Sequence, residues 1–290
     1  MKNIPITFFL EHSHYPEKIR RSILHELAVN GGKYVVLGDA MISQIIQDPG
    51  FAAVLQRELT DEGLQFMDSH APFGLDSDMN NPDDFRIITL RHLLHLHIAA
   101  MLNVKTMTIH IGNNYNFPDA SIDEQISRIS TMLDRLLPTA EELDVTICIE
   151  NIWMKLNTPE KLLEIKSRFP SDKLGFCLDS GHANIMDRGR DYPEGIACAY
   201  WKRDNSGIPC WDENIAEKML PEIVNCHLHD NFGDKDQHDL PGRGNINWQK
   251  LKEQLSRAPR LQVIQSEVIT RRNGISIKEL VQTFNNIFNN

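Results

Sequence analysis

The chain has 290 residues, of which 41% are hydrophobic and 24% are charged, and it carries a formal net charge of −10. This composition indicates a folded globular protein, and no apolar run approaches the roughly 18 residues that a membrane-spanning helix needs. The acidic balance argues against a nucleic-acid partner, which requires a basic surface, although an acidic protein can still carry a local basic patch.

Two further features bear on location. The first residues, "MKNIPITFFLEHSHYPEK", contain too few apolar residues before a charge to form a secretory signal. The five cysteines are odd in number and show no CxxC spacing, which indicates reduced thiols rather than a disulfide framework. The sequence therefore predicts a cytoplasmic protein.

Short β-rich runs alternate with helical patterns along the whole chain. We expect strands at 4–10, 33–38, 64–70, 106–111, 145–150, 174–179, 223–229 and 261–267. We expect helices at 16–29, 50–60, 83–103, 119–142, 158–168, 212–219, 247–257 and 275–288. Eight strand–helix units without a separating linker predict an α/β fold, a single-domain (β/α)8 TIM barrel over residues 1–290, with a doubly wound open sheet as the main alternative.

The alternation of side chains within the strands supports a barrel. In 106–111, Thr106, Thr108 and His110 share one face, and three apolar residues share the other. The same division recurs in 145–150, 174–179 and 223–228. The apolar faces would pack against helices, and the smaller, more polar faces would fill the barrel.

Metal-ligand residue types collect where the strands end, which is where TIM barrels place their active sites. The strand-end residues are His70, His110, Glu150, Asp179, His227 and Glu267, and the following loops add His182, Asp236 and His238. Several carboxylates on one rim would repel one another without a cation. Imidazole and carboxylate groups suit Zn²⁺, Mn²⁺ or related ions, so we expect at least one divalent metal here.

Other histidines have plainer interpretations. His92, His95 and His97 fall inside the helix expected at 83–103 and should face solvent or a subunit contact in a homo-oligomer. His229 has the same parity as His227, so it points into the mouth or simply begins the loop, and we rank it below His227 as a ligand.

At these residues the sequence resembles the xylose isomerase-like barrel superfamily, also called the AP endonuclease 2 family. That family includes sugar-phosphate isomerases and epimerases, inosose dehydratases and endonuclease IV. The resemblance covers almost the whole chain and rests on ordered motifs: "SHAPFG" (69–74), "IHIG" (109–112), "IEN" (149–151), "LDSGHAN" (178–184), "HLHDNFGDKDQHDLPGRGNINW" (227–248) and "SEV" (266–268).

The resemblance implies two nested metal sites. An epimerase-type site would use Glu150, Asp179, His227 and Glu267, with His182 binding a substrate oxygen. An endonuclease-type site would add His70, His110, His182, Asp236 and His238 and hold three zinc ions. All nine positions are filled, so the number of ions (one to three of Zn, Mn or Co) stays open.

Two departures favour the sugar-active branch. Endonuclease IV is expected to carry a proline after the histidine where this chain has "HIG", and its phosphate-loop glutamate is replaced by Arg243 in "PGRG". The resemblance then implies isomerisation or epimerisation of a ketose-type sugar or sugar phosphate. Glu150 and Glu267 would move a proton next to the carbonyl through a metal-stabilised enediolate. Dehydration of a cyclic polyol ketone, zinc-dependent hydrolysis at abasic DNA and a metal-binding barrel without turnover are the alternatives.

Residues 187–212 form a long insertion after the sixth expected strand, and it carries Tyr192, Tyr200, Trp201 and Trp211. Aromatic side chains there could stack on a sugar at the barrel mouth, or the segment could be an exposed excursion or a subunit contact. Among substrate contacts we expect His182, Arg243 and Trp201.

Overall fold

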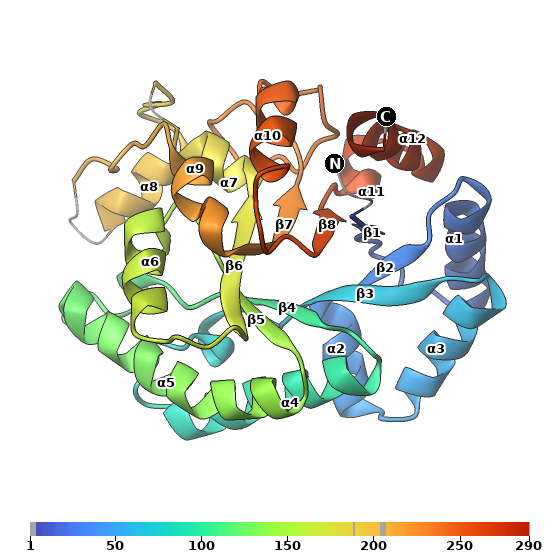
Figure 1. Ribbon diagram of the computed structural model, residues 1–290, viewed down its shortest axis with the longest axis horizontal. Helices are drawn as coiled ribbons and strands as arrows, with labels where there is room; N and C mark the ends of the chain where they lie inside the picture. The colour runs from blue at the N-terminus through green and yellow to red at the C-terminus, as the bar shows by residue number, and fades with distance from the viewer. Residues whose placement is uncertain (1–3, 188, 204–206, 290) are drawn as a thin grey trace.

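Eight parallel strands close into a barrel in sequence order in the computed structural model, which describes residues 4–187, 189–203 and 207–289 (Figure 1). The strands are β1 Ile6–Phe8, β2 Tyr34–Leu37, β3 Gln65–His70, β4 Thr106–Ile109, β5 Thr146–Glu150, β6 Leu174–Asp179, β7 Ile223–Leu228 and β8 Val263–Ser266. Pairing of β8 with β1, in the register Thr7 to Gln265, closes the barrel and excludes the open sheet. The (β/α)8 prediction is confirmed.

Helices surround the strands (Figure 1). The α-helices are α1 Glu17–Val29, α2 Asp39–Gln47, α3 Phe51–Asp61, α4 Phe85–Met101, α5 Ile122–Glu142, α6 Pro159–Ser167, α7 Ser180–Ile185, α8 Ile196–Arg203, α9 Ile215–Met219, α10 Trp248–Leu255, α11 Thr270–Asn273 and α12 Ile277–Phe288. Short 3₁₀ turns are η1 Leu75–Ser77, η2 Asn114–Asn116, η3 Lys155–Asn157 and η4 Leu220–Glu222. No described helix is both long and apolar enough to cross a membrane.

Helix α2 was not expected from the sequence. Its N-cap is Gly38, which has no side chain to accept a capping hydrogen bond, so the usual start signal is missing. The helix nevertheless buries Met41, Ile42 and Ile45. Packing of this apolar face, rather than capping, therefore stabilises the helix.

The division of strand side chains into two faces is confirmed by the contacts inside the barrel. Asn225 on β7 donates to Thr108 Oγ1 on β4 at 3.0 Å and to Asp68 Oδ2 on β3 at 3.1 Å. Thr106 donates to Asp68 Oδ1 at 2.6 Å. These polar side chains meet across the barrel, while the apolar Met107 on the opposite face of β4 is buried in the core.

The exposure predicted for the histidines of α4 was wrong at two positions. His92 and His95 are buried, and only His97 is exposed. The sequence misled because α4 is apolar around most of its circumference, so its apolar residues do not mark the buried face. The exposed positions of this helix instead include Ile87, Leu90, Leu94 and Met101.

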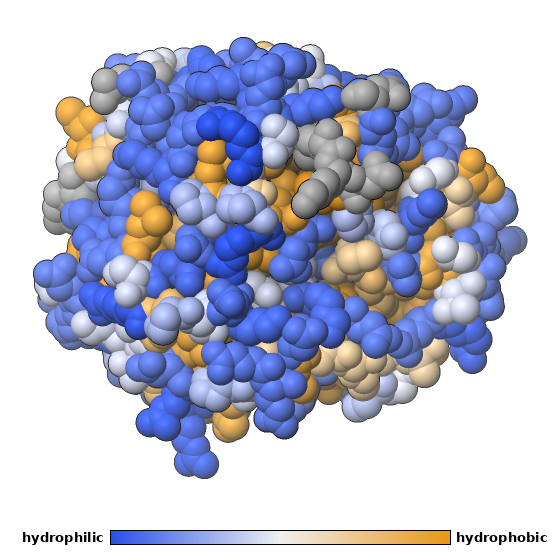
Figure 2. All heavy atoms as spheres, in the orientation of Figure 1, coloured by the Kyte–Doolittle hydropathy of each residue, from blue (hydrophilic) through white to orange (hydrophobic). Residues whose placement is uncertain are grey.

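Seen from the same side, the surface of the molecule is mostly hydrophilic, and its apolar side chains lie in separate patches (Figure 2). The last helix, α12, packs beside α1, so the two ends of the chain complete the helical ring together (Figure 1).

Candidate metal centre and active site

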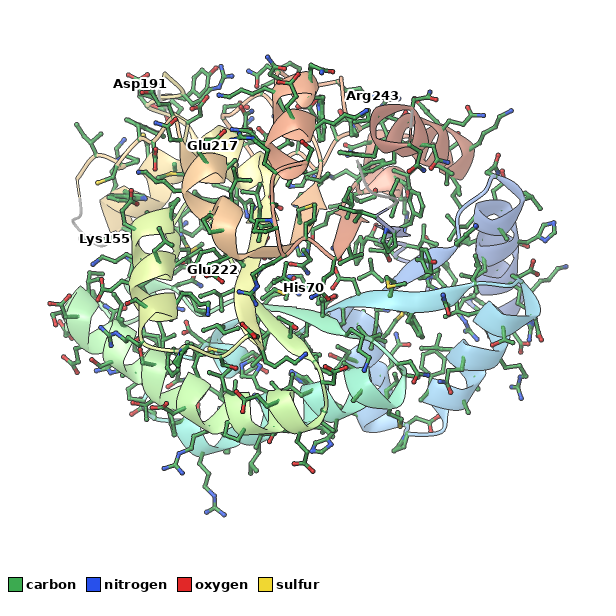
Figure 3. The ribbon with its side chains drawn as sticks, in the orientation of Figure 1. His70, Lys155, Asp191, Glu217, Glu222 and Arg243 are labelled. Atoms are coloured by element: carbon green, nitrogen blue, oxygen red, sulfur yellow. The ribbon has the colours of Figure 1, made fainter. Side chains whose placement is uncertain are left out.

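The strand-end residues meet at one pocket, as predicted. A cavity of about 370 Å³ is lined by seven of the nine predicted ligands: His70, His110, Glu150, His182, Asp236, His238 and Glu267. The other two, Asp179 and His227, are fully buried among them. Figure 3 shows His70 at the centre of the ring of strands. Each of these residues ends a strand or lies in the segment that follows one, and this explains why residues distant in sequence converge.

Glu150, Asp179, His227 and Glu267 form the first group that could hold a metal, with one ligand atom from each within 4.8 Å of the others. His227 Nδ1 lies 3.2 Å from Glu150 Oε1 and 3.4 Å from Glu267 Oε1. The two glutamates therefore approach one point from β5 and from the end of β8.

The electrostatics of this group suit a cation. Burial alone would raise the pKa of Glu150, but His227 and His110 hold it well below its usual range. Burial and the negative charges of Glu150 and Asp179 raise the pKa of Glu267 well above its usual value. A divalent ion would neutralise this repulsion, and nitrogen and carboxylate oxygen are ligands that Zn²⁺ and Mn²⁺ accept. The residues present thus fit a divalent metal.

A second group shares Glu150 and His227 with the first and adds His70. His110 lies beside it, with Nε2 2.9 Å from Glu150 Oε2, while His70 Nε2 is 3.7 Å from the same oxygen. Two of the endonuclease-type positions, His70 and His110, therefore lie beside Glu150.

A third group contains His182, Asp236, His238 and a residue that the sequence ranked low, His229. His229 lies one position beyond the end of β7 and is fully buried. The sequence signal that could have identified His229 is its position two residues after His227, which gives both side chains the same direction. His229 keeps this direction although β7 has ended.

The "DSGH" segment explains how His182 is placed. Asp179 ends β6 and caps α7, its Oδ1 accepting a hydrogen bond from the backbone N–H of His182 at 2.7 Å. Burial opposes protonation of His182, but the charges of Asp179 and Asp236 raise its pKa well above its usual value. The carboxylate of Asp179 thus caps helix α7 and also belongs to a candidate metal-ligand group.

The structure does not bring Arg243 to the pocket. Its side chain lies at the periphery, away from His70 (Figure 3), and donates to Glu279 Oε1 on α12 at 2.8 Å. Gly242, with φ 90°, forms the turn just before Arg243. The carboxylate that pairs with Arg243 belongs to Glu279, 36 residues later in the chain. The sequence offered no sign of that pairing.

Three aromatic side chains line the pocket wall: Phe73, Tyr115 and Trp153. None of them was among the site residues predicted from the sequence. The insertion supports this wall from behind, because Trp201 on α8 donates from Nε1 to the carbonyl oxygen of Trp153 at 2.7 Å. Tyr200 packs on Tyr115 at 5.2 Å between ring centroids. None of the described insertion residues lines the pocket, and residues 188 and 204–206 lie outside the described residues.

The closed barrel of parallel strands, with ligand-type side chains gathered at its carboxyl end, defines a TIM barrel with an active-site-like mouth. The chain belongs to the xylose isomerase-like TIM barrel family, which it matches over residues 29–279. The family expectation drawn from the motifs is therefore confirmed.

The chain is similar to an uncharacterized relative in sequence and to solved structures in fold. The chain is 28% identical to the uncharacterized protein MJ1311 of Methanocaldococcus jannaschii over 228 residues, which is 76% of this chain and 70% of the relative. A D-tagatose 3-epimerase-like protein matches with a TM-score of 0.71 at 22% identity, covering 99% of this chain and 98% of that one. The IOLI protein, solved with a binding zinc atom, matches with a TM-score of 0.72 at 16% identity, covering 98% and 96%.

Proposed function

We propose that this protein is a divalent-metal-dependent isomerase or epimerase of a ketose-type sugar. The main supporting observation is that Glu150 and Glu267 line one pocket and approach the same imidazole. Their Oε1 atoms lie 3.2 and 3.4 Å, respectively, from His227 Nδ1. Paired carboxylates around one point are suited to remove a proton from one carbon and return it to a neighbouring carbon or to the opposite face.

The roles follow from position. One glutamate takes the proton beside the substrate carbonyl and the other returns it, while His182, which also lines the pocket, binds a substrate oxygen. A divalent ion held by Glu150, Asp179, His227 and Glu267 would supply Lewis-acid stabilisation of negative charge on the substrate oxygens. Phe73, Tyr115 and Trp153 offer apolar faces against which a sugar ring or chain can pack.

The pocket favours a neutral sugar over a sugar phosphate. Among the described residues that line it, none is Lys or Arg, and Arg243 is engaged with Glu279 outside. Phosphate recognition ordinarily uses such cations or a helix N-terminus. The names of structural neighbours, which include a D-psicose 3-epimerase and an L-ribulose 3-epimerase, support the same substrate class.

Hydrolysis of abasic DNA is the second candidate, because the three ligand groups, two of which share Glu150, could hold more than one ion. The net charge of −10 and the lack of cationic side chains in the described pocket lining weigh against a DNA backbone. Cleavage of an abasic-site duplex by the wild type would replace the sugar proposal.

Solvent exchange tests the sugar proposal directly. Protein loaded with Mn²⁺, Co²⁺ or Zn²⁺ is incubated in deuterated water with a panel of ketopentoses and ketohexoses and their phosphate esters. NMR should show deuterium entering next to the carbonyl of an unphosphorylated ketose. Loss of water from the substrate would instead indicate the dehydratase variant.

Glu150→Gln and Glu267→Gln should each reduce exchange by about 100-fold or more, since general acid–base groups contribute roughly 10² to 10⁴. Glu217→Gln is the matched control, because Glu217 lies on α9 at the surface and pairs with Arg257. Full exchange in either pocket variant would overturn the paired-carboxylate proposal.

A further inference from the structure

The outer side of helix α4 is apolar although it lies on the surface of the subunit. Four large aliphatic side chains on it are between 43% and 58% exposed: Ile87, Leu90, Leu94 and Met101. They follow one another at intervals of three, four and seven residues, so they share one side of a helix with 3.6 residues per turn. The other side of α4, which includes Ile88, Leu96 and Ala99, is buried.

A helix that is apolar on both sides differs from its neighbour in the ring. Helix α5 packs beside α4 and is longer, yet none of its residues is among the large hydrophobic side chains that are exposed in the described chain (Figure 1). A surface helix normally keeps its solvent side polar, and a helix that is apolar all round is usually buried. The outer side of α4 is therefore expected to be covered in the assembled protein.

The turn η1 adds to this apolar surface. Arg91 on α4 donates to the backbone carbonyl of Asp76 and pairs with its carboxylate at 3.3 Å. His92 Nε2 lies 2.9 Å from the carbonyl oxygen of Ser77. These contacts hold η1 against α4, and Leu75 in this turn is 59% exposed. We define the α4 patch as Leu75, Ile87, Leu90, Leu94 and Met101.

The area of the α4 patch matches the requirement of a protein dimer. Five half-exposed side chains, at about 100 Å² each, present on the order of 500 Å² of apolar surface. A standard interface buries about 800 Å² on each partner, and about 65% of a homodimer interface is apolar, which is about 520 Å². The patch can therefore supply nearly all the apolar area that a stable dimer needs.

The pattern of the patch is also complementary to itself. Ile87 and Met101 lie seven residues before and seven residues after Leu94. When two copies of α4 pack antiparallel about a two-fold axis at Leu94, Ile87 of each copy faces Met101 of the other. The two Leu94 side chains then meet at the axis. A contact of this kind closes after two subunits, so it gives a dimer rather than a fibre.

The two ends of α4 carry charges that suit the same antiparallel packing. Asp83 and Asp84 are exposed just before the helix begins. Near its other end, Lys105 and Lys173 share the single carboxylate of Asp144, at 2.9 and 2.5 Å. Antiparallel packing brings the acidic end of one copy towards the lysine end of the other. Charges at the rim of an interface mainly fix the orientation of the partners.

We propose that the α4 patch is the interface of a homodimer in which two α4 helices pack antiparallel about a two-fold axis at Leu94. None of the patch residues lines the candidate active-site pocket. The proposal is therefore independent of the proposed sugar chemistry, and its measurements need neither sugar nor metal.

Sedimentation velocity at micromolar concentrations tests the interface. Wild type should be a dimer. Leu94→Asp places two carboxylates opposite each other at the axis and should weaken the dimer by about 100-fold or more. Ile19→Asp is the matched control, because Ile19 on α1 is 45% exposed and Leu94 is 43% exposed, and it should leave the dimer unchanged. A monomeric wild type would overturn the proposal, as would a dimer that Leu94→Asp leaves intact.

A cross-link tests the two-fold arrangement without disturbing the fold. The background is Cys198→Ser with Cys210→Ser, since these are the free cysteines of the described chain that are not buried. In this background, oxidised Leu94→Cys should run as a disulfide-linked dimer, and Ile19→Cys should stay a monomer on a denaturing gel. Absence of the Leu94→Cys cross-link would refute the axis. A monomeric wild type that floats with phosphatidylcholine and phosphatidylserine vesicles would assign the patch to a lipid surface and overturn the dimer.

Discussion

Two layers of the barrel interior contain buried acids, and their surroundings differ in kind. In the middle layer, Asp68 accepts hydrogen bonds from Thr106, Asn225 and the backbone N–H of Ser69. At the mouth, Glu267 instead faces other carboxylates, whose charges raise its pKa together with burial. A buried acid surrounded by neutral donors stabilises the fold, whereas acids crowded against one another indicate a site for a cation.

The largest expected difference between the two layers is in how much a bound metal stabilises the protein. Zinc at about 100 times its dissociation constant should stabilise the wild type by about 2.7 kcal/mol for each site that binds only in the folded state. In Glu267→Gln this gain should shrink, yet the metal-free variant should be at least as stable as metal-free wild type, because a repelled carboxylate is gone. Urea unfolding with zinc or with chelator measures both. A metal-free variant clearly less stable than wild type would contradict the comparison.

Asp68→Ala should give the opposite pattern. Thr106 and Asn225 would lose a buried acceptor, at a cost of about 1–3 kcal/mol in the free energy of unfolding, while zinc stabilisation should be unchanged. Asp68→Asn keeps one acceptor oxygen and should lose less. Reduced zinc stabilisation in Asp68→Ala would show that the middle layer belongs to the metal site.

The barrel and most of its mouth could be predicted because both depend on local alternation. The parity of 145–150 and 174–179 places Glu150 and Asp179 inside, and parallel strands bring such ends to one rim. His229 was ranked low because it follows the strand end, where parity alone cannot separate a ligand from the start of a loop. Arg243 could not be placed, since its direction depends on Glu279 in a distant helix.

Histidines show the same contrast as the acids. At the mouth, carboxylates raise the pKa of His182, whereas on α4 burial lowers the pKa of His92 to about 4 and of His95 to about 3. In the unfolded chain His92 and His95 titrate near 6.5, so below that pH the unfolded state takes up protons that the folded state refuses. The contribution of these two histidines to stability is therefore fully present above pH 6.5. On acidification it falls by about 1.4 kcal/mol per pH unit for each histidine, until the pH reaches the lowered pKa of that histidine in the folded state.

Comparison of variants isolates this contribution from that of the carboxylates. His95→Gln should show a shallower loss of stability between about pH 6 and pH 4 than wild type, measured by urea unfolding at each pH. His97→Gln, altered at an exposed position, should keep the wild-type slope. Identical slopes in all three proteins would mean that His95 already accepts a proton in the folded state.

The smallest expected effect concerns the pocket wall, where the insertion meets the mouth. Trp201→Phe keeps an aromatic ring on α8 but removes the hydrogen bond to the carbonyl of Trp153, at a cost of about 1 kcal/mol in stability. Because Trp153 lines the pocket and none of the metal ligands is touched, zinc content should be unchanged while the KM of the exchanging ketose rises. Trp211→Phe, in the same insertion but outside the wall, is the control. A changed zinc content in Trp201→Phe would show that the insertion supports the metal cluster and not only the wall that receives the sugar.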